Sequence, residues 1–379
     1  MGEIRKRPHL LQIAAALMAV KTLLPYSMVI PFSNLLDNLV LVAALGCFGL
    51  VLLLQNLSRI EFILSLLVGV VCAVTCLIID DFSILITAVT VFALRKYNIR
   101  DFVKVVFWVQ LVFCLFHVVW SSCYALMISP KPFTMVSADR QRFTFGFVHA
   151  NMFAVLALSL IMMYLWMYPS GRYRLKLAGA GLAVLTIYLF IDTRTFLVAG
   201  LLGVGMLLLV HIKNPCDILR IAVRWVIPCL TGGMLVLMLL FNAGSGIAAF
   251  ANRVLNSRVH LGAYALKELG ISLLGQNVPF YDYIDPSMSG LTTFTFDNVY
   301  SYLLVQGGVI WIALLWLAYY RVSRRASSMD CVMLLLWAVY GLCENVVLNG
   351  YFLFPIFLIA KALGGFGERN RKKRGDNRL

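Results

Sequence analysis

Charge is scarce in this sequence, and acidic residues are scarcer than basic ones. Only 13% of the 379 residues are charged, and 17 Asp and Glu stand against 32 Lys and Arg. A soluble domain carries about twice that fraction of charged residues, whereas 61% of this chain is hydrophobic. The composition therefore excludes a water-soluble globular protein and predicts a chain that is solvated mostly by lipid.

Motifs typical of several enzyme classes are also missing. The sequence has no phosphate-binding loop, no GxSxG serine elbow and no paired-cysteine zinc pattern. Its nine cysteines lie mostly in apolar segments without paired spacing, so we expect packing residues rather than disulfides or metal ligands. These absences count against an ATP-driven pump and a zinc hydrolase, and we expect neither a metal nor a cofactor.

Long apolar runs dominate what is present. They approach the roughly 20 residues that cross a bilayer as a helix, and the runs at 82–94, 177–191 and 351–364 are short enough to be tilted or re-entrant. The sequence therefore predicts an all-α polytopic membrane protein with about 12 transmembrane helices. The predicted spans are 10–30, 35–55, 61–79, 82–94, 102–127, 149–168, 177–191, 195–212, 221–241, 299–320, 331–348 and 351–364.

The runs and the loops between them suggest four parts. We expect residues 1–241 to form transmembrane helices, with a short outer loop at 128–148. Residues 242–298 are too long for a passive connection and predict an extracytoplasmic loop with structure of its own. Residues 299–364 return to the membrane, and residues 365–379 form a basic cytoplasmic tail that contacts anionic lipids.

The basic residues follow the predicted loops, which indicates a membrane topology and not nucleic-acid binding. With both termini in the cytoplasm, most Lys and Arg fall on that side, as the positive-inside rule requires. Seven of the eight exceptions lie on the outer face, so something other than topology retains them there. The eight exceptions are Lys21, which lies within a span, and Lys131, Arg140, Arg142, Arg194, Arg253, Arg258 and Lys267.

The long outer loop contains a helical pattern. Residues 246–269, GIAAFANRVLNSRVHLGAYALKEL, predict one amphipathic helix. Arg258 lies about 140° from Arg253 at 100° per residue, in the middle of the apolar face. A guanidinium keeps its proton, so it needs an anionic partner or a hydrated cavity. Arg258 therefore snorkels, or forms a salt bridge with an acid such as Asp297 or Glu344, or binds an anionic ligand at the membrane surface.

The segment DRQRFTFGFVHAN, residues 139–151, adds Arg140, Arg142 and His149 to the outer face. Arg194 follows at an outer junction between two spans, beside an aspartate. Each has an ordinary explanation by itself, because an Asp–Arg pair can cap a turn and a His at a helix start is usually a satisfied polar group. Together these regions place several cations at the outer boundary. Planar guanidiniums suit the oxygens of a diphosphate on a lipid carrier.

Two acidic residues lie where a base would act on such a ligand. Glycosyl transfer from a lipid diphosphate needs a base for the acceptor hydroxyl and cations for the departing phosphate. Asp297 closes the long loop in TFDNVYSYLL, and Glu344 lies in the outer third of its span in GLCENVVLNGYF. Either could be the base, and Glu344 could equally be a structural partner of Arg258 or Arg194.

Four stretches, in this order, resemble bacterial O-antigen and capsular polysaccharide polymerases (Wzy-type) and the related O-antigen ligases. They are RFTFGFVHAN, DTRTFLVAGLLG, LNSRVHLGAYALKELGISLLGQN and DNVYSYLLVQGGVIWIALL. Each motif is short and degenerate, and the likeness extends over about residues 60–365. Ligases often carry a histidine before the asparagine of the last motif, where this chain has Asp297. That departure favours the polymerase branch, or else moves the role of the base to Asp297.

The resemblance implies a GT-C-type fold and a metal-independent glycosyltransferase in the bacterial cytoplasmic membrane, acting on its outer face. The implied reaction transfers a growing glycan from undecaprenyl diphosphate to the next lipid-linked repeat unit. The implied partners are that lipid-linked oligosaccharide, membrane lipids, a chain-length regulator and a flippase. The resemblance implies that four arginines bind the diphosphate: Arg140, Arg142, Arg194 and Arg258. It implies Asp297 or Glu344 as the base and His149 as a positioning residue of the catalytic site. The further site residues it implies are Asn151, His260 and Asn298.

Two other functions stay open. A ligase uses the same donor and a different acceptor, which the sequence does not name. A flippase for lipid-linked glycan shares the span count and a cationic cavity, but such proteins usually lack one dominant outer loop with a helix of its own. The loop at 242–298 therefore favours an enzyme over a flippase.

Overall fold

The computed structural model describes residues 8–31, 33–55, 57–128, 133–137, 140–279 and 294–363. Helices make up nearly all of the regular structure in these residues, together with one antiparallel hairpin. Eight of the described helices are long and apolar enough to cross a membrane. The chain is therefore an α-helical polytopic membrane protein.

Two compact units make up the fold, and each is assembled from separate parts of the sequence. The first comprises Met1–Leu57, Val89–Pro215 and Gly350–Leu379, and the second comprises Ser58–Ala88 and Cys216–Asn349. α4 (Ser83–Leu94) contains the boundary between them.

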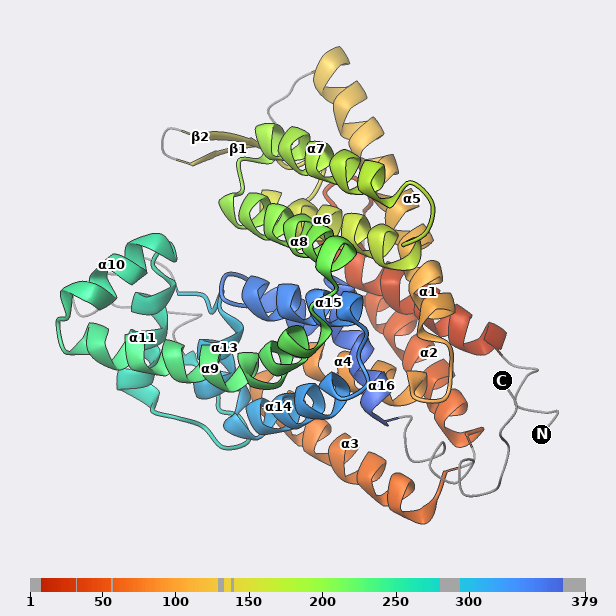
Figure 1. The fold of residues 1–379 in the computed structure, drawn as a ribbon, viewed down its shortest axis with the longest axis vertical. Coiled ribbons are helices and arrows are strands. Elements are labelled where there is room, and N and C mark those ends of the chain that lie inside the picture. Colours follow the sequence, from red (N-terminus) through yellow and green to blue (C-terminus); the bar gives the residue numbers. More distant parts are fainter. Residues whose placement is uncertain are drawn as a thin grey trace. The chain divides into compact units, whose positions relative to one another are not determined.

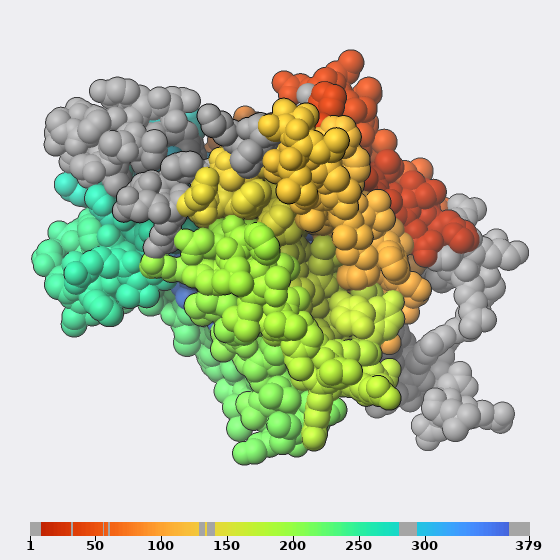
Figure 2. All heavy atoms as spheres, turned by 90° about the horizontal axis from the view of Figure 1, so that it is seen from above, coloured from red at the N-terminus to blue at the C-terminus, as the bar shows by residue number. Residues whose placement is uncertain are grey.

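The first unit contains a bundle of long helices and a hairpin (Figure 1). Its elements are α1 (Pro8–Leu23), η2 (Leu24–Tyr26), α2 (Asn34–Leu53), α5 (Ile99–Met127), β1 (Thr134–Ser137), β2 (Arg140–Phe143), α6 (Ala150–Met167), α7 (Tyr173–Ile191), α8 (Arg194–Lys213), η7 (Phe354–Ile359) and α16 (Ala360–Leu363). α1 packs on α2 and α5, and α6 packs on α5, α7 and α8. The green surfaces of α7 and α8 adjoin in Figure 2.

The second unit is organised around one long helix (Figure 1). Its elements are α3 (Arg59–Ile79), α9 (Cys216–Asn242), α10 (Gly246–Val254), α11 (Arg258–Leu269), α13 (Val299–Tyr302), the π-helical segment η5 (Leu303–Gly307), α14 (Val309–Ser323), α15 (Ser328–Tyr340) and η6 (Asn345–Leu348). α9 contacts α10, α11, α13, α14 and α15. Its buried residues recur every three or four positions and form one stripe that supports these contacts; they are Leu219, Val223, Ile227, Thr231, Met234 and Met238.

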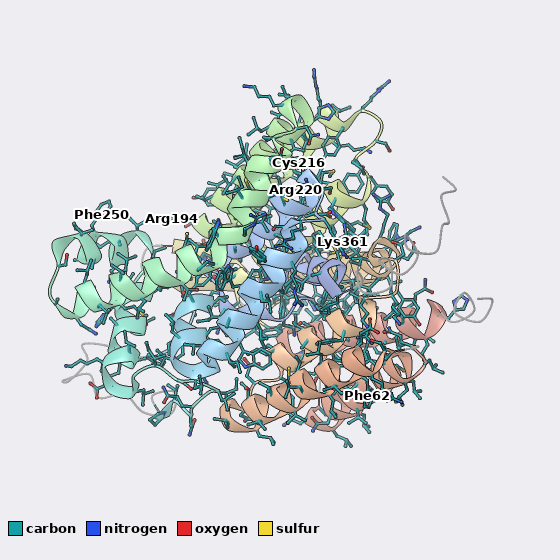
Figure 3. The ribbon with its side chains drawn as sticks, turned by 60° about the horizontal axis from the view of Figure 1, so that its bottom comes forward. Phe62, Arg194, Cys216, Arg220, Phe250 and Lys361 are labelled. Atoms are coloured by element: carbon teal, nitrogen blue, oxygen red, sulfur yellow. The ribbon has the colours of Figure 1, made fainter. Side chains whose placement is uncertain are left out.

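Polar residues mark where several helices begin and end. Ser58 and Glu61 form a reciprocal capping box at the start of α3, which satisfies backbone N–H groups that have no partner within the helix. Asp80 and Asp192 are the caps that follow the last residues of α3 and α7, with φ of 53° and 42°. Aspartate tolerates this left-handed conformation better than most residues. Phe62 of α3 and Phe250 of α10 project from their helices (Figure 3) and are exposed. An exposed phenylalanine is expected on α3, which is long and apolar enough to cross a membrane.

The long helices coincide with eight of the predicted spans. The short run at 177–191 belongs to α7, which has 19 residues. The other four runs give shorter helices: 82–94 becomes the 12-residue α4, 331–348 becomes α15 and η6, 351–364 becomes η7 and α16, and 299–320 is interrupted. A total of about 12 spans therefore stays a prediction.

The interruption of 299–320 has a local cause. Gly308 has a φ of 104°, and a Cβ atom there would lie 2.6 Å from the carbonyl oxygen of Leu273, so only glycine fits. The backbone on either side bonds to the segment that follows α11: Ser272 donates to Leu304, and Val309 donates to Ser272. The break therefore leaves few backbone groups unsatisfied, as a membrane protein requires.

The prediction of one helix at 246–269 is wrong. α10 ends at Val254 and α11 begins at Arg258, because Asn256 and Ser257 have φ of 51° and 67°. Asparagine enters this left-handed region more readily than most residues, since its side chain can bond locally. The helical-wheel angle between Arg253 and Arg258 consequently has no meaning across the break.

Candidate functional site

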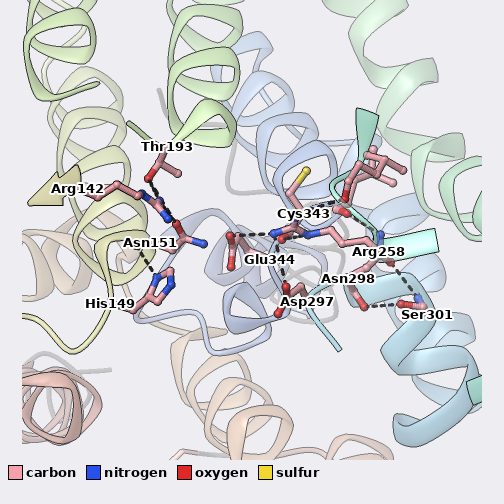
Figure 4. A network of polar contacts seen from close by, with 12 residues as sticks. Arg142, His149, Asn151, Thr193, Arg258, Asp297, Asn298, Ser301, Cys343 and Glu344 are labelled. Atoms are coloured by element: carbon pink, nitrogen blue, oxygen red, sulfur yellow. Dashed lines mark hydrogen bonds and ion pairs between the residues drawn. The ribbon is translucent and has the colours of Figure 1, made fainter. Parts of the chain in front are cut away.

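Arg258 lies at the centre of a polar cluster in the second unit (Figure 4). Its Nε donates to the carbonyl oxygen of Cys343 at 2.7 Å, and its Nη1 donates to that of Leu255 at 3.3 Å. Its Nη2 lies 3.4 Å from Oε1 of Glu344 and 3.7 Å from Oδ2 of Asp297. One guanidinium is therefore shared by two carboxylates from different parts of the chain.

The three charged side chains differ in their access to solvent. Arg258 is 7% exposed and the Glu344 side chain 11%, whereas the Asp297 side chain is 42% exposed. A charge as buried as Glu344 needs its partner, because desolvation of an unpaired carboxylate is costly. Asp297 has the longer ion pair and the more exposed side chain. Glu344 therefore suits a structural partner of Arg258, and Asp297 suits a group that meets a ligand.

Asn298 holds Asp297 in place. Its side-chain oxygen caps α13 by accepting from the backbone N–H groups of Tyr300 and Ser301. Its side-chain nitrogen donates to the carbonyl oxygen of Leu342 at 2.6 Å, two residues before Glu344. Asn298 is therefore a positioning residue that ties the segments carrying both acids to each other.

α11 reaches this position because Gly262 allows a close approach. A Cβ atom at Gly262 would lie 2.6 Å from Sδ of Met238 on α9 and 3.0 Å from Cβ of Ser301 on α13. Asn242, at the end of α9, adds a hydrogen bond to the carbonyl oxygen of Ala263 at 3.0 Å. The helix that begins with Arg258 is thus held against two neighbours.

Valine at Gly262 is expected to push α11 away from α9 and α13. Overpacking of this kind costs about 1–3 kcal/mol, and the displacement should also loosen the Arg258 contacts. Gly233→Val on α9 is the matched control, because a Cβ atom there meets nothing within 4 Å. Thermal unfolding of the purified proteins measures the difference, and equal melting temperatures for the two variants would contradict the close packing.

Arg142 forms a separate cluster within the first unit (Figure 4). From β2, its Nε donates to the carbonyl oxygen of Ile191 at 3.0 Å, and its Nη2 donates to Oδ1 of Asn151 at 2.7 Å and to Oγ1 of Thr193 at 2.6 Å. Ile191 is the last residue of α7, where helix carbonyls lack partners and a cation is favourable. Arg142 therefore joins the hairpin to the α7–α8 junction and to the start of α6.

His149 and Arg194 lie at the starts of two helices of the first unit. The Nδ1 of His149 accepts from the backbone N–H of Asn151 at 3.0 Å, so this ring caps α6. A role for His149 in a catalytic site stays a prediction. Arg194 is the first residue of α8 and is exposed, and its side chain forms no ion pair with the described residues.

The remaining predicted residues contribute less. His260 on α11 packs its ring on Phe241 of α9, with centroids 5.0 Å apart. Arg140 pairs with Ser137 in the hairpin, and its side chain lies outside the described part of the chain, as does the tail at 365–379. Within the described residues, no group of three or more His, Cys, Asp or Glu has the geometry to hold a metal ion.

Two contributors to these clusters were missed from the sequence. Thr193 binds Arg142, although the motif IDTRTF drew attention to the neighbouring arginine instead. The carbonyl oxygen of Cys343 accepts from Arg258, and no sequence signal marks a backbone acceptor. A threonine just before a helix start is a common capping position, which was the only signal available for Thr193.

No protein-family model, curated protein or solved structure matches the sequence of this chain.

Proposed function

We propose that the chain is a polysaccharide polymerase, a membrane glycosyltransferase that moves a growing glycan from undecaprenyl diphosphate to a lipid-linked repeat unit. The observation that carries the proposal is the Arg258 cluster, in which one buried guanidinium lies between a buried and a half-exposed carboxylate. A base that water can reach beside a fixed cation is what transfer from a diphosphate requires.

In this reaction the acceptor hydroxyl oxygen attacks the anomeric carbon of the donor glycan. The bond from that carbon to the diphosphate oxygen breaks as the new glycosidic bond forms. Asp297 takes the hydroxyl proton, and undecaprenyl diphosphate leaves with the electron pair of the broken bond. A cation beside the leaving group stabilises the charge that develops there.

Arg258 is the cation we assign to the diphosphate. Its contact with Asp297 spans 3.7 Å, which is longer than a charge-assisted hydrogen bond. A diphosphate oxygen can therefore compete for this side of the guanidinium, while Glu344 and the carbonyl oxygen of Cys343 keep the rest in place. Within the first unit, Arg142 serves to position the α7–α8 junction, and the assignment of Arg194 to the diphosphate stays a prediction from the sequence.

The proposal includes the finer topology expected from the sequence. It comprises about 12 membrane-spanning segments in a GT-C-type arrangement, a long extracytoplasmic loop at 242–298, cytoplasmic termini and a location in the bacterial cytoplasmic membrane. Its partners are the lipid-linked oligosaccharide, membrane lipids, a chain-length regulator and a flippase.

The size distribution of lipid-linked and surface glycan, in a strain that lacks this chain, tests the proposal. Loss of a polymerase should leave single repeat units at the surface and no ladder of longer products, and the wild-type chain should restore the ladder. Long polymer stranded on the lipid carrier would indicate a ligase instead. Single units trapped on the cytoplasmic face would indicate a flippase.

A further inference from the structure

A second basic region of the second unit lies where α9 begins and α14 ends. The two helices pack together, and residues 216–225 and 319–330 contain five arginines and two aspartates. Figure 3 places Arg220 close to the first residue of α9, Cys216. The sequence prediction puts this end of both helices on the cytoplasmic side of the membrane.

Two of these arginines stack on the same aromatic ring. The guanidinium carbon of Arg224 lies 5.2 Å from the ring centroid of Tyr320, and that of Arg324 lies 4.8 Å from it. Nη2 of Arg324 also donates to the Tyr320 hydroxyl at 2.8 Å. The tyrosine ring attracts both cations, and an anion that contacts both guanidiniums would offset their mutual repulsion.

The described residues supply no such anion. Neither Arg224 nor Arg324 forms an ion pair with them, and the Nε of Arg224 is buried among them without a hydrogen-bond acceptor. The two aspartates have other partners: Asp217 lies 3.7 Å from Arg220, and Asp330 accepts from Ser327 in the capping box of α15.

Two tryptophans lie beside Arg224, one of them next to it in the sequence. Trp225 and Trp316 are 48% and 37% exposed, with ring centroids 5.9 Å apart. The Nε1 of Trp316 donates to the backbone carbonyl of Arg224 at 3.1 Å. Indole rings favour the interface between lipid tails and headgroups. Ile221, about one helical turn before Trp225, and Leu317, next to Trp316, are also exposed and offer an apolar surface for an acyl chain.

Membrane topology alone does not account for this geometry. The positive-inside rule requires only that cations lie in or near cytoplasmic loops. It does not require two guanidiniums on one tyrosine, or a buried Nε without an acceptor. Basic sites between transmembrane helices on this side of a membrane are a common place for acidic lipid headgroups.

We propose that Arg224, Tyr320 and Arg324 form a binding site for the phosphate of an anionic phospholipid. The lipid phosphate accepts hydrogen bonds from the two guanidiniums, and its tails follow Trp225 and Trp316 into the bilayer. The site is separate from the Arg258 cluster and does not depend on the transfer reaction.

Native mass spectrometry of the whole protein, taken from nanodiscs of phosphatidylcholine mixed with phosphatidylglycerol, tests the site. Each arginine–phosphate contact near a membrane surface is worth about a five-fold change in affinity, so Arg224→Gln/Arg324→Gln should retain phosphatidylglycerol about 30-fold less well than the wild type. The single variant Arg324→Gln changes an exposed residue, should fold normally, and should show about a five-fold loss.

Arg174→Gln is the matched control, because Arg174 is exposed on α7 and is predicted to lie on the same side of the membrane. It should retain phosphatidylglycerol as the wild type does. Retention by Arg324→Gln equal to that of the control would overturn the site. Displacement of phosphatidylglycerol by inorganic phosphate at comparable concentration would assign the site to a soluble anion and overturn the lipid assignment.

Discussion

Asparagine in place of Asp297 is expected to reduce polymer formation by a factor of about 10² to 10⁴, the usual contribution of a general base. The amide keeps the shape of the side chain and cannot take the acceptor proton. Because Asp297 is 42% exposed and 3.7 Å from Arg258, losing this ion pair should cost only about 0–1 kcal/mol of stability. Transfer from lipid-linked repeat units in isolated membranes measures the rate, and immunoblotting measures the amount of protein.

His149→Ala provides the comparison for this experiment. The change removes the cap of α6, which costs about 1 kcal/mol, and it should slow the reaction much less than Asp297→Asn does. If the His149 variant were the weaker enzyme at equal abundance, the role of base would belong elsewhere.

Methionine in place of Arg258 is expected to destabilise the protein by about 3–5 kcal/mol, because the buried Glu344 would lose its ion pair with the guanidinium. Replacing both residues, as Arg258→Met/Glu344→Leu, should recover much of that loss, since an apolar pair no longer carries an uncompensated charge. The recovery should be incomplete because the carbonyl oxygen of Cys343 also loses a donor. Neither variant should make polymer.

Thermal unfolding in detergent, followed by circular dichroism, measures the coupling between the two residues. Arg253→Met is the control, since this exposed arginine on α10 should change stability by less than about 0.5 kcal/mol. Strictly additive effects of the two single changes at Arg258 and Glu344 would contradict a buried ion pair.

The long helices could be predicted from the sequence because about 20 apolar residues in succession leave few other structures. The lengths of the shorter helices could not be predicted in this way. An apolar run can be surrounded either by lipid or by other parts of the protein, and hydropathy is the same in both cases. α3 has many exposed apolar side chains, whereas ten of the 13 residues of α15 are buried. The sequences of α3 and α15 are both apolar runs, but only α3 is as long and as exposed as a helix that faces lipid.

The Arg258 cluster could also be predicted only in part from the sequence. That Asp297 or Glu344 could pair with Arg258 was predictable, because few acids were available on the predicted outer face. Which acid is buried was not, since that depends on how α13 and the segment after α15 pack. The expected burial of Arg258 is confirmed, although the helix used to predict it is interrupted at Asn256 and Ser257. Its burial follows from the packing of α11 on α9.

The division of the chain into two units also determines the order in which they can be completed during synthesis. The first unit contains the first described residues, but its core includes Tyr351, whose carbonyl oxygen accepts from Gln110 and whose ring packs near Phe102. All residues of the second unit precede Tyr351 in the sequence. The ribosome therefore synthesises the whole second unit before it synthesises the last part of the first. α5 is inserted long before Tyr351, its packing partner, is made more than two hundred residues later. A chain that stops before Gly350 loses part of the core around α5, far from the point of truncation in sequence.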